Sequence, residues 1–123
     1  MITGVVTPSH EAIIRLQVRG GGGHEDTVDA AIDTGFNGFP TLPPRLVSEL
    51  LLQFAGTTRA TLGDGSEIQM DVFEAVVLWD GHERHVVVLT AGGGALVGMS
   101  MLTGCRVTLD VEEGGSVTIE ALR

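Results

Sequence analysis

The strongest constraint on the fold is a repeated pattern of short strand-like runs that end at glycine-containing turns. The clearest run is EIQMDVFEAVVLW, residues 67–79, which lies between GDGS at residues 63–66 and the dipeptide Asp80-Gly81. Asp-Gly between two β-rich runs favours a hairpin, because both residues tolerate the backbone angles of a tight turn. Turns that recur about every ten residues predict a mostly β chain, closed into a barrel or packed as a sandwich.

Other segments share this strand-like character. Residues 12–18 approximate the alternation of a half-buried strand, the glycines at residues 20–23 break the run, and residues 27–32 are expected to return as the second strand of a hairpin. Further strands are expected at residues 57–62, 83–90, 95–97, 105–111 and 116–122.

Two segments favour helix. In residues 44–54, leucine and valine recur at helical spacing and proline occurs only at the start, where a helix tolerates it. The glycine loop at residues 92–94 leads through a short apolar run to a second, shorter helix at residues 99–102. Before the first of these helices, the proline-rich residues 40–44 are expected to bend the chain.

Composition limits the class of protein. A length of 123 residues fits one domain, so residues 1–123 are expected to form a single unit. No apolar run approaches the ~20 residues of a membrane span, and the opening MITGVVTPSHE has no secretory pattern. A net charge of −9 with seven Lys and Arg argues against nucleic-acid and anionic-membrane partners. The single cysteine, Cys105, suits a reducing compartment, so a cytoplasmic location is expected.

Several apparent motifs do not support chemistry. The glycines at residues 92–98 do not complete a dinucleotide fingerprint, and no phosphate-binding G-K-[ST] occurs. His82 and His85 are three apart in an expected strand, so they point to opposite faces and cannot grip one metal ion. Cys105 lies in a strand-like run and is most simply a small core residue. The sequence therefore predicts no cofactor and no metal site.

Asp33 stands apart from the other aspartates of the chain. It directly follows the apolar residues 30–32, whereas Asp64 and Asp80 lie beside glycine in turns, where aspartate is common. Thr34 and Gly35 then supply a hydroxyl and an unencumbered backbone amide, both suited to fix a carboxylate. Taken alone, Asp-Thr-Gly is better explained as a turn after a strand.

Three segments together resemble the retropepsin-like (clan AA) aspartic peptidases. AAIDTGFNGF, residues 30–39, resembles their active-site strand and turn; ATLGDGSEIQM, residues 60–70, stands where the family has its flap hairpin; and ALVGMSMLTG, residues 95–104, resembles the apolar strand and glycine before their short helix. The closer likeness is to prokaryotic single-domain members. Ser100 stands where these often carry Asp, so a polar contact at the start of the helix is expected to be lost.

The resemblance implies a fold and a site. The fold is a mostly β, closed β-barrel with one or two short helices, in which the strands that end at Asp33 and Gly98 lie side by side in a pseudo-twofold arrangement. In the family the aspartate is catalytic, the threonine bonds across the dimer axis and the glycine amide holds the carboxylate, which here implies Asp33, Thr34 and Gly35. The implied flap residues, which close over an extended peptide, are Gly63, Asp64 and Gly65.

The chemistry implied is hydrolysis of a peptide bond by a water held between two carboxyl groups, of which only one ionises. One Asp-Thr-Gly per chain then requires a homodimer with Asp33 of each copy near the twofold axis. A peptide or an unfolded protein is the expected substrate. Family dimers often share a sheet of terminal strands. Residues 116–122 are a candidate for it, unless they pair with residues 105–111 of the same chain.

Two other functions stay open. The first is a non-catalytic retropepsin-like domain that dimerises and binds peptides without cleaving them, because a fold indicates less about activity than about architecture. The second, weaker hypothesis is a metal-assisted hydrolase that uses scattered Asp and His residues, although their spacing does not match a ligand set.

Overall fold

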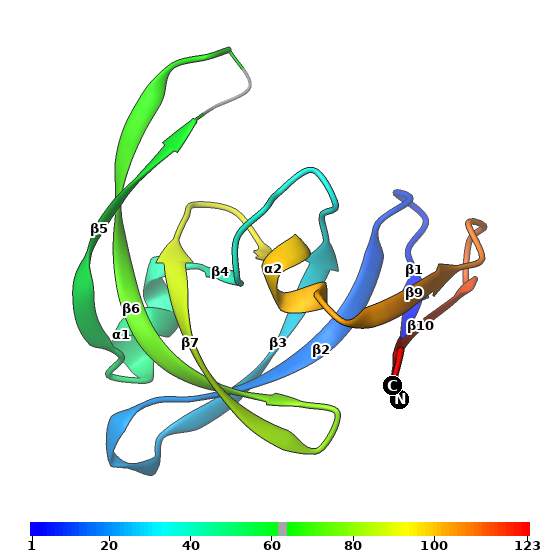
Figure 1. Ribbon diagram of the computed structural model, residues 1–123, viewed down its shortest axis with the longest axis horizontal. Helices are drawn as coiled ribbons and strands as arrows, with labels where there is room; N and C mark the ends of the chain where they lie inside the picture. Colours follow the sequence, from blue (N-terminus) through cyan, green and yellow to red (C-terminus); the bar gives the residue numbers. More distant parts are fainter. Residues whose placement is uncertain (62–63) are drawn as a thin grey trace.

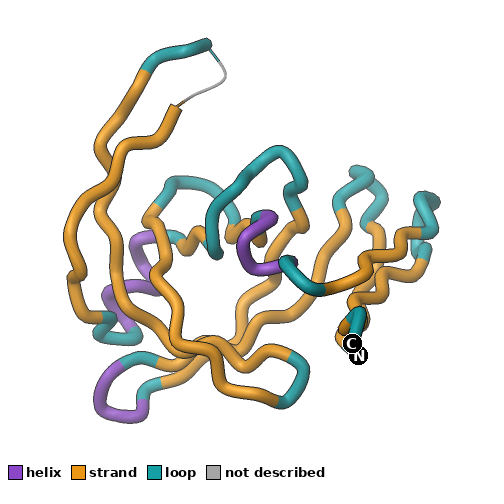
Figure 2. Tube along the Cα trace, viewed as in Figure 1, coloured by secondary structure: helices purple, strands orange, loops and turns teal. Residues whose placement is uncertain are grey.

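A single β-sheet dominates the computed structural model, which describes residues 1–61 and 64–123 (Figure 1). The strands within these ranges are β1 (Ile2–Val6), β2 (Ala12–Arg19), β3 (Glu25–Ile32), β4 (Thr41–Leu42), β5 (Gln53–Thr61), β6 (Glu67–Trp79), β7 (His82–Thr90), β8 (Ala95–Val97), β9 (Cys105–Leu109) and β10 (Ser116–Ala121). The helices are α1 (Pro44–Glu49), α2 (Met99–Leu102) and the 3₁₀ turn η1 (Gly21–Gly23). Figure 2 shows them as short interruptions between strands. Within the described ranges, no helix has the length and apolar character needed to cross a membrane.

Six of the strands close into a barrel. The order in the sheet is β5-β6-β7-β4-β8-β3-β2-β1-β10-β9, and β2 pairs additionally with β6, where Val18 lies opposite Val77. The ring therefore runs β2-β6-β7-β4-β8-β3 and returns to β2. In a closed ring each of the six strands has a neighbouring strand on both sides, so none of them is an edge strand of the barrel.

Alternating side chains of the barrel strands form the core. In β2, Ile14, Leu16 and Val18 are almost fully buried, and Val77 of β6 and Val97 of β8 are 0% exposed. The three residues of β2 are two positions apart, and successive side chains of a strand point to opposite faces, so a single face of β2 supplies the interior. The expectation of a mostly β, closed barrel with two short helices is confirmed.

The terminal strands extend the sheet beyond the barrel. β10 pairs with β9 on one side and with β1 on the other, where Ile119 lies opposite Val107 and Ile2 respectively. Two alternatives were open for residues 116–122: a spare edge offered to a partner, or pairing within the same chain. The second, pairing with residues 105–111 of the same chain, is what the structure shows, and β1 occupies the other edge.

The helix expected at residues 44–54 is shorter than its leucine spacing predicts. α1 ends at Glu49, because Leu51 adopts a left-handed backbone (φ 52°) that turns the chain back toward the barrel. Leu50 and Leu52 are both buried in the core, whereas Leu51 is exposed. The short strand β4 lies in the proline-rich bend, and β1 lies in the opening segment; neither was expected as a strand.

Candidate active site

Asp33 lies at the end of two parallel strands in the barrel wall. β3 and β8 run side by side, with Ala30 opposite Ala95 and Ile32 opposite Val97. The backbone N–H of Asp33 donates to the carbonyl of Val97 at 2.9 Å and so extends this pairing by one residue. The expectation that the strands ending at Asp33 and Gly98 lie side by side is confirmed. Asp33 is thereby attached to a rigid part of the core.

The carboxylate of Asp33 is held from one side. The backbone N–H of Gly35 donates to Asp33 Oδ1 at 3.0 Å, and the N–H of Phe36 donates to the carbonyl of Asp33 at 3.2 Å. Asp33 is half-buried, whereas Thr34 and Gly35 are exposed. Among the described residues, no hydrogen bond involves the hydroxyl of Thr34. A single chain thus presents an oriented carboxylate, with a free hydroxyl beside it, at its surface.

Helix α2 holds the loop that follows Asp33. The N–H of Met99 donates to the carbonyl of Phe36 at 2.7 Å, and the N–H of Ser100 donates to that of Asn37 at 3.2 Å. The hydroxyl of Ser100 also donates to the Asn37 carbonyl. The loss of a polar contact expected at Ser100 is therefore wrong, because the shorter side chain bonds the loop backbone directly.

Gly98 permits this close approach of the loop. A Cβ built on Gly98 would lie 2.6 Å from the carbonyl oxygen of Phe36 and closer still to that of Gly38. Both neighbours are backbone atoms held by the same loop, so they cannot rotate away as a side chain would. Glycine at this position keeps the loop, and with it Asp33, in place.

The β5–β6 hairpin forms an arm that projects from the barrel, on the side to which the loop after β3 also points (Figure 1). Of the expected flap residues, Gly63 lies outside the described residues, and Asp64 and Gly65 lie near the end of the arm. No hydrogen bond joins Asp64 or Gly65 to Asp33, Thr34 or Gly35 within the described part of the chain. The structure therefore joins Gly35 to Asp33 by a hydrogen bond, whereas the described residues of the arm make no hydrogen bond with the Asp-Thr-Gly segment.

A local turn shapes the arm beside Asp64. The N–H and the hydroxyl of Ser66 donate to Asp64 Oδ1 at 2.9 and 2.6 Å. The hydrogen bond from the Ser66 hydroxyl, followed by that from the Ser66 N–H, lowers the pKa of Asp64 below its ordinary value. The sequence predicted a turn at residues 63–66 but not the bonds from Ser66 to Asp64, although Asp followed two residues later by Ser is the pattern of such a turn.

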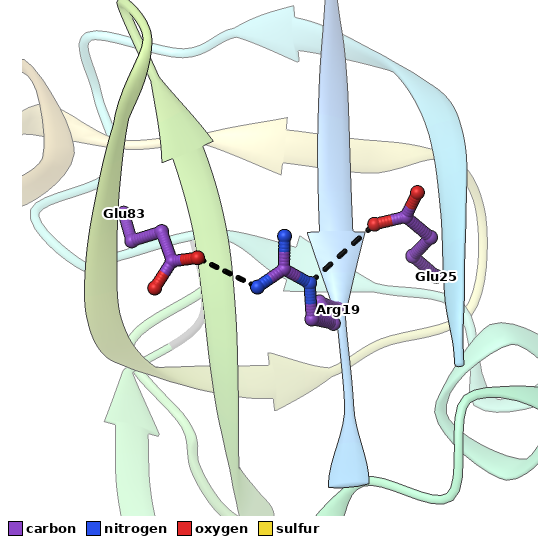
Figure 3. A network of polar contacts seen from close by, with 3 residues as sticks. All are labelled: Arg19, Glu25 and Glu83. Atoms are coloured by element: carbon purple, nitrogen blue, oxygen red, sulfur yellow. Dashed lines mark hydrogen bonds and ion pairs between the residues drawn. The ribbon is translucent and has the colours of Figure 1, made fainter. Parts of the chain in front are cut away.

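A second polar cluster joins the strands where the barrel closes. Arg19 of β2 lies between Glu25 of β3 and Glu83 of β7, at 3.4 and 2.7 Å (Figure 3). The hydrogen bond to Glu83 is the main cause that raises the pKa of Arg19 above its ordinary value. The Arg19 side chain is 34% exposed and those of Glu25 and Glu83 are 45% and 52% exposed, so water screens the ion pairs and they add little stability. We interpret the cluster as structural.

A cavity of about 610 Å³ next to this cluster does not include Asp33. Its lining residues are Arg19, Gly20, Gly21, Phe39, Gln53, Glu74, Ala75, Val76, His85, Val86 and Val87. We nevertheless place the candidate site at Asp33. Asp33 is the residue that the sequence predicts to be catalytic, and the structure bonds its carboxylate to the Gly35 amide.

His82 and His85 lie at different cavities. His85 lines the 610 Å³ cavity, whereas His82 lines a separate one of about 170 Å³ beside Cys105. No group of three or more His, Cys, Asp or Glu side chains that could hold a metal ion occurs in the part of the chain that the structure describes. Cys105 packs against the core but is only half-buried.

Comparisons with known proteins give a likeness in fold. No family model matches the chain, and no curated protein matches its sequence. The fold is similar to the solution structure of the Simian Foamy Virus (mac) protease, with a TM-score of 0.49 and 19% sequence identity over 72% of this chain and 90% of that chain.

Replacing Gly98 by alanine tests its packing role. We expect Gly98→Ala to lower the free energy of unfolding by about 1–3 kcal/mol, because the added methyl group meets backbone oxygens. Gly92→Ala is the matched control, since nothing lies within 4 Å of a Cβ at Gly92. The control should leave stability unchanged or raise it slightly. Urea denaturation measures both, and equal effects would contradict the packing role of Gly98.

Replacing Ser66 by alanine tests the turn at Asp64. Ser66→Ala removes the main cause of the lowered pKa of Asp64, so this pKa should rise toward its ordinary value in a carboxyl NMR titration. A carboxylate with a lowered pKa in the folded state stabilises that state above its unfolded pKa, and the effect is lost as the pH falls through the folded pKa. Any destabilisation by Ser66→Ala should therefore appear near neutral pH and fade in acid.

The control for this titration is Ser9→Ala, which removes a hydroxyl that contacts Glu11 in another part of the molecule. It should leave the titration of Asp64 unchanged. An unaltered Asp64 titration in Ser66→Ala would show that the Ser66 hydroxyl does not lower this pKa.

Proposed function

We propose that this chain is an aspartic endopeptidase that acts as a homodimer, with Asp33 of each copy forming the catalytic pair. The observation that carries the proposal is the position of Asp33: a half-buried carboxylate at the end of paired parallel strands, bonded to the Gly35 amide and open on its other side. The proposal takes residues 1–123 as one retropepsin-like domain and its working location as the cytoplasm.

The proposed chemistry needs two carboxyl groups about 3 Å apart, one protonated and one ionised. The ionised Asp33 takes a proton from water, whose oxygen attacks the peptide carbonyl carbon, while the protonated Asp33 donates its proton to the carbonyl oxygen. A proton then passes to the amide nitrogen as the C–N bond breaks, which yields a carboxylic acid and an amine. One chain supplies half of this pair.

The surface around Asp33 supports an arrangement of two copies. Thr34 and Gly35 are exposed beside the carboxylate, and the Thr34 hydroxyl is free of hydrogen bonds among the described residues. An isologous contact presents the same patch from both subunits, so residues at its centre meet their own copies. We assign Thr34 to the contact across the axis and Gly35 to orienting the carboxylate.

The projecting arm supports a peptide as substrate. We propose that Gly63, Asp64 and Gly65 close over an extended peptide, whose backbone adds strand-like hydrogen bonds to the hairpin. Unfolded proteins offer such extended segments, so they are the substrate class that we expect. The chain's net charge of −9 makes nucleic acids and anionic membranes unsuitable partners.

The direct test is Asp33→Asn. We expect cleavage of an unfolded protein between about pH 4 and 7 to fall by a factor of at least about 10³, because the amide cannot act as acid or base. The dimer should persist, as checked by sedimentation, since the amide keeps the shape of the side chain. Asp29→Asn, on the exposed surface of β3, is the matched control and should cleave normally. Retained cleavage in Asp33→Asn would reject the proposal.

A binding domain without turnover is the competing function, and its sign is ligand binding without cleavage. A statine-type mimic of the transition state should raise the melting temperature of either protein, because a ligand of the folded state stabilises it. Only the peptidase should also cut members of a peptide library. Stabilisation with no cleavage under any of these conditions would favour the binding domain.

A further inference from the structure

The cavity of about 610 Å³ beside the Arg19 cluster lies where β2, β5, β6 and β7 meet. Two rows of opposed residues line it: Arg19, Val76 and His85 in one row, and Gln53, Glu74 and Val87 in the other. The rows are two residues apart along β6, a distance of about 7 Å. The volume falls within the range of about 300–1,000 Å³ that is typical of pockets for small molecules. The cavity is therefore large enough to hold a ligand.

The floor of this cavity is apolar and open to water. In β6, Ala75 is buried in the core, so Glu74 and Val76 on either side of it point outward. In β7, Val87 is 45% exposed, although its neighbour Val86 is buried. Covering this exposed apolar surface with an apolar part of a ligand would remove it from water, which favours binding.

Glu74 supplies a carboxylate at one end of the floor. The Glu74 side chain is exposed, and its carboxylate makes no hydrogen bond or ion pair within residues 1–61 and 64–123. Gln53 lies directly opposite on β5, and the carbonyl oxygen of its side chain is a second acceptor. A charged acceptor bonds most strongly to a charged donor. The two side chains together suit an ammonium group.

The charges around the cavity also favour a cation. Arg19 lines the cavity, but its guanidinium group already contacts Glu83 at 2.7 Å and Glu25 at 3.4 Å (Figure 3). With Glu74, three glutamates surround one arginine, which leaves an excess of two negative charges, or of one if His85 is protonated. An anion would have to compete with two glutamates for Arg19. The net charge of −9 on the whole chain likewise attracts cations.

We propose that this cavity binds a small organic cation, a primary ammonium group attached to an apolar body about the size of a phenyl ring. The ammonium group donates hydrogen bonds to the Glu74 carboxylate and to the side-chain carbonyl of Gln53. The apolar body covers Val76 and Val87, which lie beside Glu74 along β6 and across to β7.

This site is separate from the candidate active site. None of Asp33, Thr34 and Gly35 lines the cavity, and the proposed ligand is a small amine rather than a peptide. The inference therefore goes beyond the proposed function and does not depend on it. Its experiments measure binding and not cleavage, so either proposal can fail without the other.

Three ligands of similar shape test the charge of the ligand. Phenethylamine is cationic, phenethyl alcohol is neutral and hydrocinnamate is anionic. In an NMR titration near neutral pH, we expect the dissociation constant of phenethylamine to be at least about fivefold lower than those of the other two, because the charged donor bonds a carboxylate more strongly. High salt should weaken the binding of phenethylamine. Equal or tighter binding of hydrocinnamate or phenethyl alcohol would overturn the proposal.

Replacing Glu74 by glutamine tests the carboxylate. Glu74→Gln keeps the shape of the side chain but removes its charge, so the dissociation constant of phenethylamine should rise about five- to tenfold. Asp71→Asn is the matched control. Asp71 is an exposed carboxylate of the same strand, lies three residues away on the opposite face and does not line the cavity. The control should bind the amine as the original chain does, and equal effects of the two variants would contradict the role of Glu74.

Replacing Gln53 by lysine tests the position of the ammonium group. Gln53→Lys places an ammonium group of the chain itself opposite Glu74, where opposite charges on paired strands attract each other. This variant should raise the dissociation constant of phenethylamine at least about tenfold. Thermal unfolding shows whether the variant is folded. Undiminished binding by the folded variant would overturn the proposed position.

Chemical shifts and Asp33→Asn separate this site from the candidate active site. The amide signals of Glu74, Val76 and Val87 should move during the titration with phenethylamine, and that of Gly35 should not. Asp33→Asn should bind phenethylamine as the original chain does. Loss of binding in Asp33→Asn would place the amine at the Asp33 carboxylate and overturn the inference. Binding at the cavity by a chain whose cleavage does not depend on Asp33 would reject the peptidase proposal alone.

Discussion

The pairing of β2 with β6 is the contact on which the rest of the structure depends. β2 already pairs with β3 along most of its length, and the three residues from Gln17 to Arg19 pair also with β6. That second contact converts an open sheet into a ring and encloses the buried face of every barrel strand. Without it, Val18 and Val77, both 0% exposed, would face water. Arg19 pairs with Val76 of β6 at this point, and its side chain contacts Glu25 of β3 and Glu83 of β7.

Closure of the barrel also creates the setting for Asp33. β8 has only three residues, which is too few for a stable strand of its own. It is held between β3 on one side and β4 on the other, so Thr41 lies opposite Leu96 while Ile32 lies opposite Val97. The candidate carboxylate thus depends on contacts between segments more than fifty residues apart. The close approach of Gly98 to the loop at Phe36 and Gly38 is another contact of this kind.

Local chemistry made much of the fold predictable from the sequence. The bounds of β6 and α2 agree with the expected residues, and Asp80 and Gly81 adopt the positive φ values, 52° and 79°, that a tight hairpin turn requires. The Asp-Thr-Gly segment was likewise identifiable, because its residues are neighbours in the chain. β4 was missed because its two residues are strand only through pairing with β7 and β8. The contact of Ser100 with Asn37 was missed for the same reason: its partners are distant in sequence.

Strand β6 is part of both the barrel and the projecting β5–β6 arm. Its inner residues alternate into the barrel core and, from Val72 onward, pair with β7. Residues 67–71, by contrast, pair with β5 alone in the arm. A two-stranded ribbon in water is marginally stable by itself, and a closed barrel is not. The free energy of local opening should therefore rise steeply along this one strand, from its outer end to its inner end. Amide hydrogens of a single thirteen-residue element would exchange on widely separated timescales, with the boundary near Val72.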